Sequence, residues 1–80
     1  MNQLEVLRES LGQCDEIVLD ALLMRNRIVE DIMAYKEAND IPILQPEQEA
    51  KQREWLNRRM EGRRHKDEVT AVFEEITRNS

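Results

Sequence analysis

Arg25 and Lys36 are the residues whose types and spacing most suggest chemistry. Arg25 interrupts an otherwise apolar helical stripe, where an unpaired charge is costly. Lys36 follows eleven residues later, so at about 100° per residue both side chains share one helix face, roughly 16 Å apart. Two cations on one face could bind a small dianion. The alternative is that Arg25 fixes the register of a helix pair or pairs with a nearby acid.

Arg8 can join this pair only from another chain. It precedes Arg25 by seventeen residues, about 25 Å along a helix, which is too far for one small ligand. If two copies of the helix pack antiparallel about a midpoint near residue 19, Arg8 of one copy lies level with position 30 of the other. Arg8 then falls between Arg25 and Lys36, and three cations converge on one pocket despite the acidic net charge. Alternatively, Arg8 and Lys36 only form exposed ion pairs, which add little stability.

A long amphipathic helix is required to hold these residues. Between residues 4 and 38 there is no proline, and the one glycine is Gly12. In a heptad repeat that begins at Leu4, nine of the ten a and d positions are apolar or nearly so. These positions are Leu4, Leu7, Leu11, Cys14, Val18, Ala21, Arg25, Ile28, Ile32 and Tyr35. Such a helix extends about 50 Å, so we expect this short chain to form an oligomer.

Two shorter helices are expected after the long one. Pro42 interrupts the first pattern, and Pro46 suits the first turn of a second helix. Gly62 is a suitable C-terminal cap for that helix, and apolar residues at helical spacing follow from Val69 to Ile76. The sequence therefore predicts one all-α domain, residues 1–80, with three helices at about 4–38, 46–61 and 67–79.

The composition argues against several classes of protein. Seventeen acidic and twelve basic residues give a net charge of −5, which disfavours general binding to nucleic acids. The single cysteine, Cys14, excludes an internal disulfide and belongs to no metal-ligand cluster. No apolar run approaches the roughly 20 residues that span a bilayer, and the N-terminal residues are unlike a signal peptide. We therefore expect a cytoplasmic protein without a metal ion and without a membrane or nucleic-acid partner.

An ordered set of short motifs resembles the all-helical class (type II) of chorismate mutase over the whole chain. No single motif is specific, but their order and separations are. The motifs are Leu7-Arg8-Glu9, Cys14-Asp15-Glu16-Ile17, Met24-Arg25-Asn26-Arg27, Tyr35-Lys36, Ile41-Pro42-Ile43, Pro46-Glu47-Gln48-Glu49 and Phe73-Glu74-Glu75-Ile76.

The resemblance implies an isomerase that converts chorismate to prephenate, on the shikimate route to phenylalanine and tyrosine. The implied fold is an intertwined homodimer of three-helix chains, whose long first helices pair antiparallel. Each of its two sites would take one arginine from the partner chain, in agreement with the convergence inferred from spacing. The rearrangement needs no cofactor, so none is expected.

The resemblance also implies roles for individual residues. Arg25 and Arg8 of the partner chain would bind the two carboxylates of the substrate, a task suited to guanidinium groups. Lys36 would donate to the ether oxygen and to a carboxylate, Glu49 would accept from the ring hydroxyl, and Ser80 would lie near a carboxylate.

Three features depart from the family pattern. Gln48, which is expected to contact the substrate, stands where the family often has arginine, and Gln45 where it often has aspartate. The second donor to the ether oxygen would lie beyond Ser80, which suggests a domain excised from a larger aromatic-biosynthesis enzyme. Two alternatives therefore stay open: a non-catalytic helical dimerisation or regulatory module of the same fold, and an isochorismate pyruvate-lyase.

Overall fold

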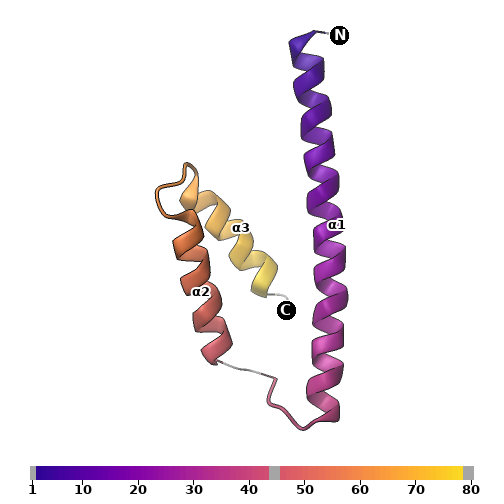
Figure 1. Cartoon of the computed structure of the whole chain (residues 1–80), viewed down its shortest axis with the longest axis vertical. Helices are drawn as coiled ribbons and strands as arrows, with labels where there is room; N and C mark the ends of the chain where they lie inside the picture. Colours follow the sequence, from indigo (N-terminus) through magenta and orange to yellow (C-terminus); the bar gives the residue numbers. More distant parts are fainter. Residues whose placement is uncertain (1, 44–45, 79–80) are drawn as a thin grey trace. The chain divides into compact units, whose positions relative to one another are not determined.

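The computed structural model describes residues 2–43 and 46–78, which form three helices. They are α1 (Gln3–Ala38), α2 (Pro46–Met60) and α3 (Lys66–Arg78), coloured along the chain in Figure 1. No strand occurs within these two described stretches. The expectation of an all-helical chain with one long and two short helices is therefore confirmed. The chain divides into two compact units, Met1–Glu37 and Ala38–Ser80, each described below by itself.

Local interactions account for both ends of α1. The side-chain oxygen Oδ1 of Asn2 accepts a hydrogen bond of 2.8 Å from the backbone N–H of Glu5, which is the usual arrangement of an N-cap. Glu5 and Lys36 place opposite charges in the first and last turns, where each opposes the charge of the helix dipole. Asp40 has a φ of 56°, a left-handed conformation that a right-handed helix cannot continue.

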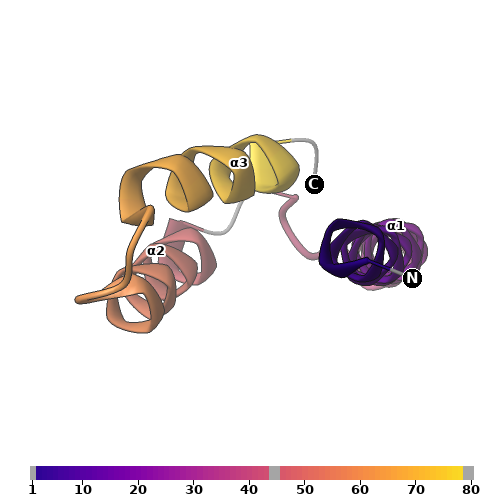
Figure 2. The same ribbon diagram turned by 90° about the horizontal axis from the view of Figure 1, so that it is seen from above.

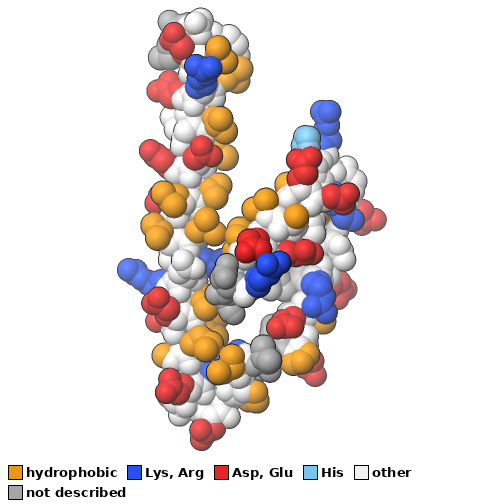
Figure 3. Space-filling model, turned by 180° about the vertical axis from the view of Figure 1, so that it is seen from behind, with side chains coloured by type: hydrophobic (Ala, Val, Ile, Leu, Met, Phe, Trp, Pro, Cys, Tyr) orange, Lys and Arg blue, Asp and Glu red, His pale blue; other side chains and the backbone are white. Residues whose placement is uncertain are grey.

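The apolar stripe of α1 is largely exposed in the single chain. No described residue of this helix is buried, and Leu11, Val18 and Ile32 keep 61%, 50% and 47% of their surface accessible. In the space-filling view, hydrophobic side chains follow α1 for most of its length (Figure 3). An exposed apolar surface of this extent is typical of an interface with another polypeptide.

The second unit is a helical hairpin with a small core. Viewed from above, α2 and α3 lie side by side (Figure 2). Leu56 of α2 is the one buried apolar residue among those described, with 8% of its surface accessible. The rings of Trp55 and Phe73 lie with their centroids 5.7 Å apart at an angle of 54°, a favourable tilted aromatic pair across the two helices.

The connection between α2 and α3 contains two residues with left-handed backbone. Gly62 has a φ of 70°, as expected for a glycine that caps a helix. The next N–H, that of Arg63, donates to the carbonyl of Met60 at 3.0 Å. His65 has a φ of 60°, its carbonyl accepts from the N–H of Val69 at 2.9 Å, and its exposed Nδ1 lies 3.5 Å from Oε2 of Glu68. These contacts close one helix and start the next.

We predict that the chain forms a homodimer through the stripe of α1. Sedimentation equilibrium at micromolar concentration should give about twice the chain mass of 9.5 kDa. Val18→Glu should shift the protein towards monomer, because it places a charge near the proposed midpoint of two antiparallel helices. Ala34→Glu, about 160° around the same helix, serves as the control and should leave the mass unchanged. A wild-type monomer would contradict this prediction.

Candidate active site

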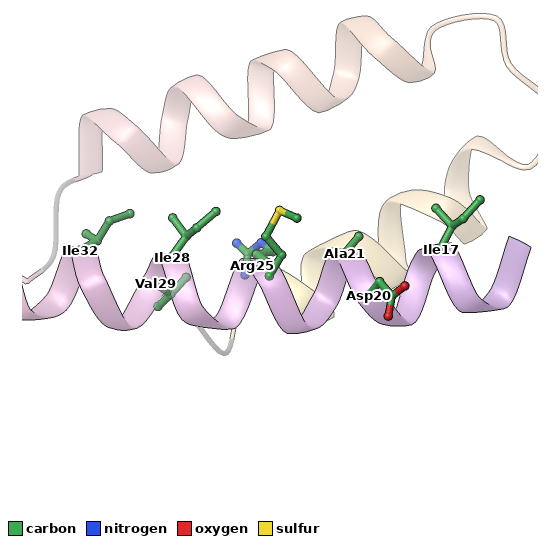
Figure 4. A pocket seen from close by; sticks show the side chains of 8 residues that line it. Ile17, Asp20, Ala21, Arg25, Ile28, Val29 and Ile32 are labelled. Carbon is green, nitrogen blue, oxygen red and sulfur yellow. The ribbon is translucent and has the colours of Figure 1, made fainter.

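Arg25 lies in a hollow on α1 that is lined mainly by apolar side chains. The lining residues are Ile17, Asp20, Ala21, Met24, Arg25, Ile28, Val29 and Ile32. In Figure 4, the side chains of Ile17, Ala21, Ile28 and Ile32 project from the same side of α1, and Arg25 lies between Ala21 and Ile28. This arrangement follows from the helical repeat, since residues three or four apart share a face.

Apolar surroundings strengthen the electrostatic attraction between the guanidinium of Arg25 and an anion. Arg25 is half-buried, whereas most of α1 is exposed. A charge beside apolar surface interacts more strongly with an incoming anion than a fully hydrated charge does, because water screens it less. Guanidinium also matches a carboxylate with two parallel hydrogen bonds. The hollow is therefore suited to hold a carboxylate of a partly apolar ligand.

Lys36 shares a continuous helix with Arg25. It is half-buried and lies in the last turn of α1. Because α1 is unbroken between them, the two cations point along one face with an axial separation of about 16 Å. Arg8 is exposed on the same helix and lies about 25 Å before Arg25. One copy of α1 therefore does not bring Arg8 to the hollow, and the shared site stays a prediction.

Gln48 and Glu49 lie in the other unit, in the first turn of α2. Both are exposed, and they line a second hollow together with Lys51, Gln52 and Trp55. The positive end of the α2 dipole favours the carboxylate of Glu49 at this position. Gln52 and Trp55 were not identified from the sequence, although Gln52 follows Glu49 by three residues and Gln48 by four. Ser80 and Gln45 lie outside the described residues.

The described part of the chain contains neither a metal-binding cluster nor a membrane-spanning helix. No group of three or more histidine, cysteine, aspartate and glutamate side chains is arranged to hold a metal ion there. Cys14 is an exposed free thiol. None of the described helices is long and apolar enough to cross a membrane.

The comparison with protein families agrees with these features. The chain matches the family described as chorismate mutase type II over residues 7–80. No curated protein and no solved structure matches the chain. The family match includes both hollows, most of α1 and the whole of α2 and α3. On this evidence the chain belongs to the chorismate mutase type II family.

Proposed function

We propose that this protein is a chorismate mutase that acts as a homodimer with sites shared between chains. The observation that carries the proposal is the half-buried Arg25 in an apolar hollow, on the face that Lys36 also occupies. Membership of the family supports mutase activity in general. The proposed setting is the cytoplasm, where the product prephenate leads to phenylalanine and tyrosine.

The reaction sets a particular requirement for the site. Chorismate rearranges in one step, in which a carbon–oxygen ether bond breaks as a carbon–carbon bond forms. No proton transfer, cofactor or covalent intermediate is needed. Catalysis must therefore come from holding the substrate in its compact conformer and from stabilising the charge that develops in the transition state.

The two carboxylates of chorismate allow the protein to hold that conformer. Arg25 binds one carboxylate at the apolar hollow, and Arg8 of the partner chain binds the other. Fixing both carboxylates brings the side chain of the substrate over its ring, so that the two carbon atoms that will bond approach each other. The entropy cost of bringing the substrate into its compact conformer is then met on binding and not in the chemical step.

Lys36 provides the electrostatic part of the mechanism. Negative charge grows on the ether oxygen as its bond to the ring breaks. An ammonium group beside that oxygen is therefore worth more in the transition state than in bound chorismate, which is the condition for raising turnover. Glu49 accepts a hydrogen bond from the ring hydroxyl, and Gln48 makes a neutral contact with the substrate. For Ser80 we propose the role that the family resemblance implies, a contact with a carboxylate.

The proposal is tested by following absorbance with purified protein and either chorismate or isochorismate. A mutase consumes chorismate and yields prephenate. A pyruvate-lyase instead releases pyruvate from isochorismate, and a non-catalytic module alters neither compound. Turnover of isochorismate alone, or of neither compound, would contradict the proposed reaction.

Removal of either cation from the α1 face should cause a large loss of mutase activity. Arg25→Ala and Lys36→Ala should each lower kcat/KM for chorismate by at least ~100-fold, the usual scale for loss of a preorganised electrostatic contact. The control variants are Arg63→Ala and His65→Ala, in the connection between α2 and α3. Their kcat/KM for chorismate should stay within a few-fold of the wild-type value. If Arg25 instead only fixes the helix register, its alanine variant would keep activity and change its mass in sedimentation.

Gln48→Ala should raise KM more than it lowers kcat. A neutral amide contributes similar contacts to the substrate and the transition state, so its loss weakens both about equally. Steady-state kinetics with chorismate measures this effect, with Gln13→Ala on α1 as a matched exposed control. An unchanged KM would mean that the side chain of Gln48 points away from the substrate.

The shared site can be tested by mixing two inactive variants. Arg8→Ala and Arg25→Ala homodimers should each be nearly inactive, because every site lacks one arginine. After the two proteins are unfolded and refolded together, half of the dimers should be mixed. One site of a mixed dimer then carries both substitutions, and the other carries neither, so activity should return to about a quarter of wild type.

The same experiment discriminates a site built within one chain. In that case every site of a mixed dimer keeps one substitution, and activity is not restored. Confirmed mixed dimers with no more activity than their parents would therefore disprove the shared site, while leaving the reaction itself open to the assay described above.

A further inference from the structure

Gln52 is one of the five residues that line the hollow on α2. At about 100° per residue its side chain lies roughly 40° around the helix from Gln48 and 60° from Glu49, so the three share one face. Gln52 is half-buried, whereas the other four lining residues are exposed. Trp55, with 46% of its surface accessible, forms a wall of the same hollow and packs on Phe73.

The amide of Gln52 makes no hydrogen bond to any other described residue. A primary amide offers two N–H donors and a carbonyl acceptor. Leaving such groups without partners costs free energy once they are partly withdrawn from water. A ligand that supplies a hydrogen-bonding group to the hollow would relieve this cost.

The charges of the hollow specify the kind of group that fits. Glu49 and Lys51 together give it no net charge, and the carboxylate of Glu49 repels a second carboxylate. Glu49 can only accept hydrogen bonds, whereas the Gln52 amide can donate them. A hydroxyl satisfies both neighbours at once, because it donates its proton to Glu49 and accepts an N–H from Gln52.

We propose that Gln52 determines specificity by donating an amide hydrogen bond to the ring hydroxyl whose proton Glu49 accepts. This inference rests on the proposed function, in which the hydroxyl belongs to chorismate. The pair of residues favours a substrate with the hydroxyl at that ring position. It disfavours isochorismate, whose hydroxyl is attached to a different ring carbon, because the polar groups of the hollow then stay unpaired.

The test replaces Gln52 by methionine, which keeps the length of the side chain and removes its amide. kcat/KM is measured with chorismate and with a chorismate analogue that lacks the ring hydroxyl. Gln52→Met should lower the value for chorismate about tenfold and leave that for the analogue unchanged. Asn57→Met, an exposed position about 140° around α2, is the matched control and should change neither value.

A second variant guards against loss of packing at this half-buried position. Gln52→Glu keeps the shape of the side chain but cannot donate a hydrogen bond when ionised, so it should also lose the preference for chorismate over the analogue. Circular dichroism verifies that both variants keep their helix content. Equal losses with both substrates, or a full preference in Gln52→Glu, would overturn the proposal.

Trp55 gives a readout that does not depend on turnover. It is the one tryptophan of the sequence, so its fluorescence should report prephenate that enters the hollow. Gln52→Met should raise the Kd of prephenate about tenfold relative to wild type and to Asn57→Met. If wild-type protein binds prephenate but does not convert chorismate, the proposed reaction fails, and the Kd values alone decide the role of Gln52. An unchanged Kd in Gln52→Met overturns that role.

Discussion

The apolar stripe of α1 must be removed from water, and the rest of the structure depends on that requirement. The helix has 36 residues, none of those described is buried in the single chain, and its large apolar side chains stay about half exposed. Burial of apolar surface contributes about 25 cal/mol per Å², and the hairpin of α2 and α3 has Leu56 as its one buried apolar residue among those described. A second copy of the chain offers a matching stripe, which is why we propose that folding and association are coupled.

The position of Arg25 within this stripe connects assembly to substrate binding. A stripe that is covered by a second helix also draws the guanidinium away from water, and withdrawing a charge from water costs free energy. An anionic ligand offsets that cost. In the proposed dimer, chorismate therefore stabilises the assembled state as well as occupying its site, because it binds the dimer and not the separated chains. In that dimer the charge of Arg25 would favour an anionic ligand.

The regular parts of this fold could be predicted from the sequence because they rest on local rules. The heptad pattern indicated the long helix, α2 begins at Pro46 as expected, and Gly62 has the positive φ of a capping residue. The end of α1 at Ala38 lies where the sequence placed it, although the first break after the helix is the left-handed conformation of Asp40 and not Pro42. Arg25 was identified because a charge in an apolar stripe is conspicuous. Gln52 was not, because a glutamine on a polar helix has no such contrast until its half-burial is known.

The unbroken course of α1 also limits how this protein can evolve. Each residue of an α-helix adds a fixed rotation of about 100°. Inserting or deleting one residue between Arg25 and Lys36 therefore rotates one cation by that angle relative to the other. Such a change would separate the two side chains around the helix without altering either residue. Insertion or deletion of three or four residues would leave Arg25 and Lys36 on nearly the same helix face. Their separation along the helix axis would change by about 5 Å. Homologous sequences should therefore differ between Arg25 and Lys36 by substitution only. Insertions and deletions should occur mainly in the connections on either side of α2.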